Sequence, residues 1–211
     1  MIHLLLFLVL PPLGAMLPEA YPEGEVVSAD HPVVKQVISL TERTRTIQAS
    51  FVQEKFVSML QEPIVSPGSL SWSAPDRVRW EVKGERPTTI LSVGTQVRVT
   101  QDGEEKQLGP GEKRIYGTIN EIMKGLMSGS SLTDPGMAPK YVLEPDHLLV
   151  SLTPQEELLS RRVENIALKF DRSSGKLLRM SMQQKDGDRT VLTFSSVVLD
   201  ARLPAGTFTD L

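Results

Sequence analysis

The feature that most restricts the fold of this chain is a series of short runs in which apolar and polar side chains alternate. In the stretch "GSLSWSAPDRVRWEV", large apolar residues occupy alternate positions: Leu70, Trp72, Val78, Trp80 and Val82. Successive side chains of a strand point to opposite faces, so the pattern predicts two short strands, each with one apolar and one polar face. The "APD" between them predicts a turn.

Runs of the same kind, separated by turn sequences, cover most of the chain. The turn sequences include "GT" at 94–95, "DG" at 102–103, "RSSGK" and "KDGDR", which favour antiparallel pairing of neighbouring strands. A meander is the simplest topology for such a series. Further strands are predicted over about 49–56, 88–93, 96–101, 140–144, 147–153, 163–171, 176–184 and 190–200.

A helical period replaces the alternation in two places, the first of them near the start of the chain. Apolar residues recur at helical spacing from Val33 to Thr41, which predicts an amphipathic helix over about 31–46. Asp30 is the predicted N-cap, and Pro32 falls in the first turn.

The second helix is predicted over about 118–128, inside an otherwise β-rich sequence. Thr118 and Glu121 match a capping box, and Gly129 is the expected stop. The following "GSSLTDPGMAP" is interpreted as a flexible loop. The apolar stripe of this helix must cover another apolar surface.

Many strands, two helices and no βαβ alternation indicate an antiparallel α+β fold. About ten strands are more than a compact two-layer core usually needs, which favours a strongly curved sheet or an open barrel. The alternation shows that the strands have apolar faces. It leaves open whether those faces form a packed core or the wall of a cavity.

The N-terminus contains the apolar run "LLLFLVL", which has the length of a secretory signal and is too short to span a membrane as a helix. We predict a cleaved signal peptide over residues 1–20, a flexible segment over 21–29 and a single domain over 30–211. The chain has no cysteine, so neither a disulfide nor a lipid-bearing cysteine is expected. The predicted location is the periplasm, without a lipid anchor.

Composition and motifs argue against several function classes. A net charge of -3 without a basic cluster argues against nucleic acid, and the three histidines are scattered, so we expect no metal site and no cofactor. The acidic pairs at 104–105 and 156–157 lie in polar stretches, where nothing would shift their pKa values apart. His147 follows Asp146, but no G-x-S-x-G motif accompanies them. We therefore expect a protein that is not an enzyme.

Four segments between about residues 30 and 208 occur in a distinctive order: "ASFVQEK", "SPGSLSWSAPDRVRWEV", "SSGKLLRMSMQQKDGDRTVLTF" and "LPAGTFTD". This order resembles the LolA family of periplasmic outer-membrane lipoprotein carriers, in a divergent branch. The resemblance implies a half-open antiparallel β-barrel with helices over its apolar concave side. It also implies a monomeric carrier that takes acylated lipid or lipoprotein cargo from an inner-membrane transporter to an outer-membrane acceptor.

In such a carrier the apolar faces would line a cavity for acyl chains. Methionines would suit that role, because flexible thioether chains adapt to varied shapes, although they also fill gaps in ordinary cores. The predicted lining residues are Phe51, Leu70, Trp72, Val78, Trp80, Val82, Ile119, Ile122, Met123, Leu126, Leu168, Phe170, Met180 and Met182.

One position departs from the resemblance. LolA carriers commonly have an arginine before the proline of the "PDRVRW" segment, tied to closure of the helical lid, whereas this chain has Ala74 before Pro75. The departure leaves open a cargo other than lipoproteins, such as a glycolipid. Two other functions stay open from the residues: a lipid-sensing regulatory or interaction module on the same fold, and a hydrolase of the cell envelope.

Overall fold

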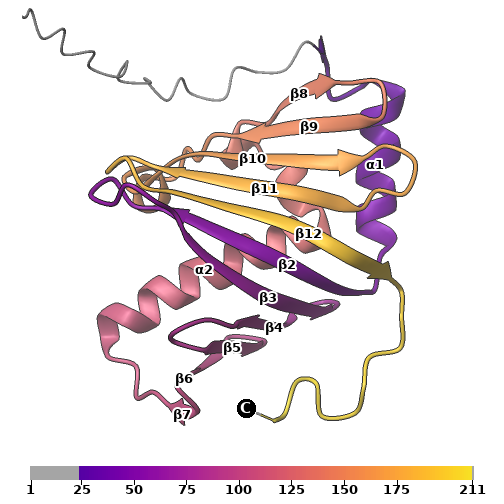
Figure 1. The fold of residues 1–211 in the computed structure, drawn as a ribbon. Coiled ribbons are helices and arrows are strands. Elements are labelled where there is room, and N and C mark those ends of the chain that lie inside the picture. The colour runs from indigo at the N-terminus through magenta and orange to yellow at the C-terminus, as the bar shows by residue number, and fades with distance from the viewer. Residues whose placement is uncertain (1–23, 211) are drawn as a thin grey trace, which may run out of the picture.

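Twelve strands form one antiparallel sheet in the computed structural model, which describes residues 24–210 (Figure 1). The strands are β1 (Glu25–Val27), β2 (Thr46–Phe56), β3 (Ile64–Ser73), β4 (Arg77–Val82), β5 (Thr88–Val93), β6 (Gln96–Gln101), β7 (Glu104–Glu105), β8 (Lys140–Leu143), β9 (His147–Leu152), β10 (Val163–Asp171), β11 (Leu177–Gln184) and β12 (Arg189–Leu199). The helices are α1 (Pro32–Arg43), α2 (Pro110–Ser128) and α3 (Glu157–Ser160), with 3-10 turns η1 (Ser130–Leu132) and η2 (Pro135–Met137).

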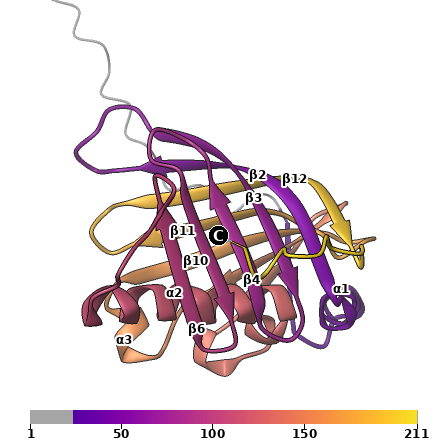
Figure 2. The same ribbon diagram turned by 90° about the horizontal axis from the view of Figure 1, so that it is seen from below.

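The strand order is β1-β8-β9-β10-β11-β12-β2-β3-β4-β5-β6-β7. Two meanders, β2 to β7 and β8 to β12, therefore meet where β12 pairs with β2. Because β1 and β7 lie at opposite ends of this order, the sheet is open. Strands β10 and β11 run across the direction of β4 and β6 in Figure 2, as the twist of a large sheet requires.

The strand predictions agree closely with this sheet, and the antiparallel α+β class is confirmed. Strands β5, β6 and β10 have the predicted bounds, and the other predicted strands differ by a few residues. The β2–β3 hairpin is longer than expected, because pairing continues to Lys55 opposite Ile64, where the alternation is weak.

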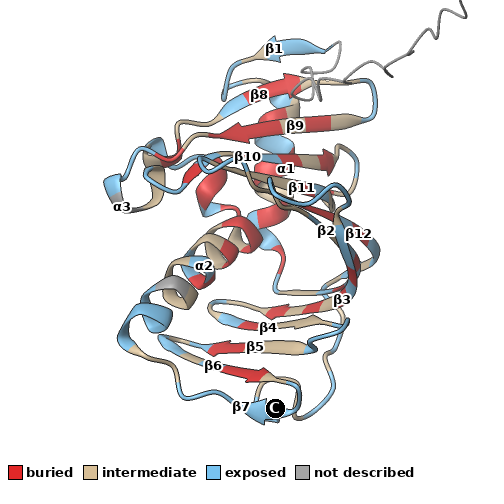
Figure 3. Ribbon diagram, turned by 60° about the vertical axis from the view of Figure 1, so that its left-hand side comes forward, coloured by how far each residue is buried: buried red, intermediate tan, exposed pale blue. Residues whose placement is uncertain are grey.

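The alternation also identifies the buried face of the sheet. Leu70 and Trp72 are each 1% exposed and Val78 is 3% exposed, while Arg77 in the same run is exposed. One core cluster joins these strand residues to Val34, Val37 and Ile38 of α1 and to Met123, Leu126 and Met127 of α2. Figure 3 shows the buried segments along β9, β10 and α2.

Helix α1 begins one residue after the predicted start and ends at Arg43, three residues before the predicted end, and its N-cap is His31 rather than Asp30. The His31 Nδ1 atom accepts a hydrogen bond from the Val33 amide at 3.3 Å. Asp30 instead forms an exposed ion pair with Lys35, with Oδ1 and Nζ 2.8 Å apart. The prediction of Asp30 was therefore wrong, because the helix starts one residue later than the carboxylate requires.

Helix α2 begins eight residues before the predicted start at 118, since its first residue is Pro110. The Glu112 carboxylate caps this end by accepting from the Gly109 amide at 3.0 Å. Thr118 lies inside the helix and donates to the Arg114 carbonyl at 3.0 Å, so the predicted capping box was wrong. The predicted stop is confirmed, because Gly129 is the C-cap with φ 79°.

The segment after α2 is packed rather than a free loop. It forms η1 and η2, and Leu132 is fully buried. The Tyr141 hydroxyl donates to the Leu132 carbonyl at 2.6 Å, which fixes the segment to β8. The sequence did not predict this packing, because its polar turn residues indicate a loop and do not show what the few apolar residues contact.

At the N-terminus, β1 lies within the segment 21–29 that the sequence predicts to be flexible. Its three residues pair with β8, and such a short run carries no readable alternation. The predicted signal peptide, 1–20, lies outside the described residues. Among the helices of residues 24–210, none has both the length and the apolarity needed to cross a membrane.

Candidate functional site

The candidate site is the apolar interface between the helices and the inner face of the sheet. Strand residues reach it because every second side chain of β3, β10 and β11 points inward. Helix α2 adds a stripe at spacings of three and four residues, namely Met123, Leu126 and Met127. Helix α1 covers a second part of the sheet with Val34, Val37 and Ile38.

Nine of the fourteen predicted lining residues are buried in this interface. They are Phe51, Leu70, Trp72, Val78, Met123, Leu126, Leu168, Phe170 and Met180. Four more are partly buried and pack against the same cluster: Trp80, Val82, Ile122 and Met182. Ile119 is 41% exposed, so the structure does not bring it into the interface. Ile119 continues the spacing of the stripe toward the start of α2, but the sheet does not cover it there.

The aromatic residues of the interface are arranged around Phe51. Its ring stacks on Trp80, with centroids 4.2 Å apart and planes inclined by 25°, and it meets Phe194 edge-on at 6.1 Å. Trp72 is deeper, and its buried indole N–H has no hydrogen-bond partner among the described residues. Trp80 is thus the tryptophan nearer the surface, and Trp72 belongs to the packed core.

A small cavity of about 30 Å³ lies within the interface. Three of its lining residues were predicted: Leu70, Leu126 and Phe170. The others were missed: Thr41, Thr44, Ile47, Ala49, Met127, Gly175, Leu177, Phe194, Val197 and Leu199. The C-terminal end of α1, the start of β2 and the end of β12 therefore form much of the wall.

The missed residues of β12 have a structural explanation. Pairing of β12 with β2 is irregular between Ser195 and Val198, and Ser196 has φ 51°. An irregularity of this kind reverses the alternation, so Phe194, Val197 and Leu199 all line the cavity although their numbers differ in parity. A strict alternation of inward and outward side chains could not predict that all three line the cavity.

Thr41 of α1 and Thr44, the C-cap of that helix, contribute to an apolar wall in spite of their hydroxyl groups. Thr41 Oγ1 donates to the Val37 carbonyl at 2.9 Å, and Thr44 Oγ1 donates to the Leu40 carbonyl at 2.9 Å. Because both hydroxyls are satisfied within the helix, they need no partner from the cavity. The cavity can therefore accept hydrocarbon without leaving these donors unpaired.

The volume of the cavity decides how the interface can bind a ligand. A cavity of about 30 Å³ has room for no more than a few water molecules, whereas pockets for small molecules are roughly 300–1,000 Å³. The closed interface is accordingly a packed core with one small gap. A cavity of this size does not hold an acyl chain.

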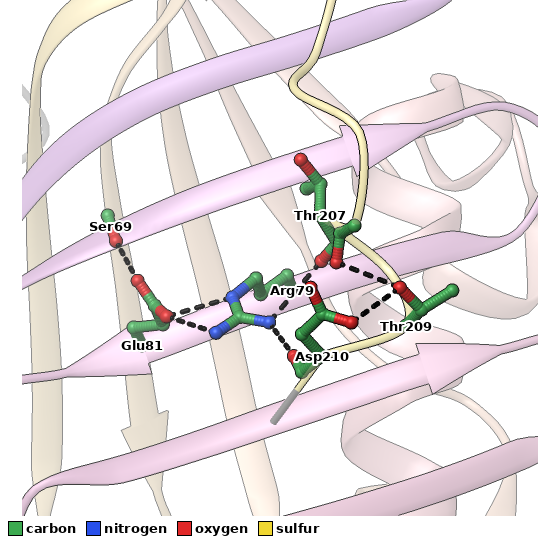
Figure 4. A network of polar contacts seen from close by, with 7 residues as sticks. Ser69, Arg79, Glu81, Thr207, Thr209 and Asp210 are labelled. Carbon is green, nitrogen blue, oxygen red and sulfur yellow. Dashed lines mark hydrogen bonds and ion pairs between the residues drawn. The ribbon is translucent and has the colours of Figure 1, made fainter.

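The opposite face of the sheet carries a polar network that holds the C-terminal segment (Figure 4). The Arg79 guanidinium pairs with Glu81 at 2.8 Å and donates to the carbonyls of Thr207 and Asp210. Partial burial would raise the pKa of Glu81, but hydrogen bonds from Ser69 and Arg79 outweigh it and lower that pKa. A groove of about 470 Å³ lies beside this network and is lined in part by Gln48, Ser71, Arg79 and Thr207.

The polar groups around His147 form ion pairs and hydrogen bonds that stabilise turns. His147 Nδ1 is 3.4 Å from the Glu144 carboxylate, which also meets Lys169 Nζ at 3.1 Å. Ser173 and Ser174, in the nearby β10–β11 turn, donate to Asp171 instead. These hydrogen bonds lower the Asp171 pKa to about 2. The groups stabilise turns, and no nucleophile and base are aligned by these contacts.

One glutamate of each acidic pair forms an ion pair on the surface of the protein. Glu105 forms an exposed ion pair with Arg98, and Glu157 forms one with Arg161. Within residues 24–210, no group of three His, Asp or Glu side chains is placed to hold a metal ion.

The sequence of this chain matches a family model and a related protein. The family model described as "Outer membrane lipoprotein carrier protein LolA" matches residues 42–210. A relative from Dechloromonas aromatica (strain RCB), an outer-membrane lipoprotein carrier protein, is 26% identical over 176 residues, which are 83% of this chain and 81% of the relative.

Similar solved structures are more distant in sequence. A LolA-superfamily protein from Nitrosomonas europaea is 14% identical with a TM-score of 0.45, over 84% of this chain and 96% of that one. The lipoprotein LppX of Mycobacterium tuberculosis is 12% identical with a TM-score of 0.44, over 82% of this chain and 95% of that one.

Proposed function

The chain belongs to the LolA family of outer-membrane lipoprotein carriers, and from that premise we propose that it carries acylated lipid through the periplasm. The observation that carries the proposal is the apolar interface between α1, α2 and the sheet, which already contains a gap lined mostly by apolar side chains. Opening of the interface would create a surface suited to acyl chains. The carrier would bind and release its cargo without chemical change.

The hydrophobic effect can supply the affinity. Burial of each methylene group contributes about 0.8 kcal/mol, so one long acyl chain offers roughly 10 kcal/mol before the cost of opening and ordering is subtracted. Opening also separates apolar side chains that contact each other in the closed form. Exposed to water, these side chains favour either reclosure or a bound acyl chain, which gives a carrier that does not remain open and empty.

The finer parts of the proposal concern architecture and location. The open sheet and the helices would act as a half-open barrel with α1 and α2 over its concave side, within a single domain from residue 30 to 211. We expect cleavage of the signal peptide 1–20, a periplasmic monomer without a lipid anchor, an inner-membrane transporter as donor and an outer-membrane acceptor.

The cargo class is broader than lipoprotein alone. The interface offers apolar contacts and few polar ones, and hydrocarbon presents few groups by which one acyl chain can be told from another. With Ala74 before Pro75, the closing contact described for the family is not made by that position. A glycolipid or another acylated lipid therefore fits the proposal as well as a lipoprotein does.

Native mass spectrometry of the protein purified from its own cell envelope tests the proposal. We expect a fraction of the protein to carry extra mass that corresponds to an acylated molecule and is lost on mild activation. Leu126→Trp would place a large side chain beside the cavity and should reduce that fraction. A protein that is always empty, and that stays empty when mixed with lipoproteins or fatty acids, would contradict the carrier function.

A further inference from the structure

The contacts that hold α2 on the sheet control access to the apolar interface. The cavity of about 30 Å³ is too small for an acyl chain, and Leu126 and Met127 of α2 form part of its wall. If the protein carries acyl chains as proposed above, α2 is an element whose movement enlarges this cavity. Any specific polar contact between α2 and the sheet must then break during opening.

Lys124 makes such a contact. Its side chain is only 16% exposed, and its Nζ atom lies 3.0 Å from the Gly94 carbonyl oxygen and 2.8 Å from Glu121 Oε1. Gly94 lies in the turn between β5 and β6, with φ 61°. Its amide in turn donates to the Asp76 carbonyl at 3.3 Å, in the β3–β4 turn. One ammonium group therefore connects the helix to the β5–β6 turn and, through Gly94, to the β3–β4 turn.

The position of Lys124 on the helix makes the contact specific. Met123 precedes it and Leu126 follows two residues later, and both are buried in the interface. Lys124 thus lies at the border of the buried stripe, where its aliphatic stem is covered and its charge reaches the turn. A partly buried ammonium needs hydrogen-bond acceptors, and the Gly94 carbonyl is the acceptor that the β5–β6 turn supplies.

The second acceptor, Glu121, makes the contact reversible. Glu121 is on the same helix and is 71% exposed, so it stays with Lys124 when α2 moves. Opening would then break the bond to Gly94 and leave the ammonium paired with Glu121 and water. The exposed pair by itself contributes little to closure, because solvent screens it.

We propose that Lys124 is a positioning residue that latches α2 onto the β5–β6 turn and so sets how often the apolar interface opens. The inference rests on the proposed carrier function for its purpose, but the latch can be measured without cargo. The closed form would be favoured by one charge-assisted hydrogen bond. Its removal should raise the open population by about tenfold.

The test compares three variants of the full mature protein. Lys124→Met removes the ammonium and keeps the length of the side chain, whereas Lys124→Arg keeps a cation that can reach the carbonyl. Lys113→Met makes the same chemical change at an exposed position of α2 and serves as the control. Amide hydrogen exchange in 110–128 reports opening, and stopped-flow binding of a fluorescent fatty-acid probe reports access.

For Lys124→Met we expect about tenfold faster exchange in α2 and similarly faster association and dissociation of the probe. Exchange in β10 and β11 should stay at the wild-type rate, which separates opening from global unfolding. Lys124→Arg and Lys113→Met should behave like the wild type. Equal exchange in Lys124→Met and Lys113→Met would overturn the latch, even if the probe binds. If the wild type does not bind the probe while the amides of α2 exchange faster in Lys124→Met, the carrier function is contradicted but the proposed role of Lys124 in holding α2 is supported.

Discussion

Phe51 and Gly68 face each other across β2 and β3, and the Phe51 ring lies over the glycine. Since Gly68 has no side chain, the ring can cross β3 and stack on Trp80 of β4 at 4.2 Å. A Cβ atom at position 68 would overlap the Phe51 ring and the Glu81 carbonyl oxygen. The contact between the aromatic residues of the interface thus depends on one glycine.

The first prediction follows from that dependence. Gly68→Ala should lower the free energy of unfolding by at least about 2 kcal/mol, because the aromatic ring and the strand backbone must both shift. Gly111→Ala is the matched control, since its added Cβ would meet no atom from outside the neighbouring helix backbone within 4 Å, and alanine favours helix in α2. Urea denaturation measures both. Equal stability of the two variants would show that Phe51 does not pack over Gly68.

The second prediction compares a covered and an exposed position on the same side of α2, seven residues apart. Leu126 is 2% exposed and lines the cavity, so Leu126→Ala should cost about 2–4 kcal/mol of unfolding free energy. Ile119 is 41% exposed, and Ile119→Ala should change stability by less than about 0.5 kcal/mol. Thermal or denaturant unfolding distinguishes them. A larger loss from Ile119→Ala would mean that the sheet also covers the part of α2 around Ile119.

The third prediction concerns acid stability. The Asp171 pKa is lowered to about 2 in the folded protein by hydrogen bonds from Ser174 and Ser173. Because the folded pKa lies below the unfolded value, the carboxylate stabilises the fold above about pH 4, and that contribution is lost as the pH falls toward 2. Wild type should therefore exceed Asp171→Asn in denaturation midpoint at pH 5, and the difference should shrink by pH 2. A constant difference across this range would contradict the assignment.

The fourth prediction concerns His147, which meets Glu144 and has no assigned part in proton transfer. His147→Ala should leave binding of an acyl probe and function in cells largely intact. Glu144→Gln, which changes the other partner of the pair, should behave in the same way in the binding assay. Complete loss of function in a folded and abundant His147→Ala protein would favour an envelope hydrolase.

The sequence predicts the strands well and the cavity wall poorly, for physical reasons that particular residues show. Alternation is a local property, so the inward positions of Leu70 and Trp72 follow from their neighbours alone. The helical start at Pro110 was also readable, because a proline in the first turn followed by Glu112 is typical of a helix start. The apolar period becomes clear only later in the helix, which explains the late prediction.

The other residues of the cavity wall are placed there by contacts between segments that are far apart in the sequence. Phe194 and Val197 both line the cavity because the strand is irregular at Ser196, and a single sequence does not mark that irregularity. Thr41 lines it because α1 is placed against the end of the sheet. Lys124 shows the same limit, since its partner Gly94 is thirty positions away in the sequence and belongs to a turn.

The central claim is that the interface opens to accept an acyl chain, and tryptophan fluorescence measures this most directly. Trp80 is partly buried at the edge of the aromatic group, while Trp72 is 1% exposed, so the Trp72→Phe and Trp80→Phe variants each report one position. Titration with a fatty acid should cause a saturable change in the emission of Trp80 in Trp72→Phe, because hydrocarbon replaces water and ring contacts around the indole. The response should be weaker in Trp80→Phe. If neither tryptophan responds to any acyl ligand in well-folded protein, the interface is a filled core and the carrier account is contradicted.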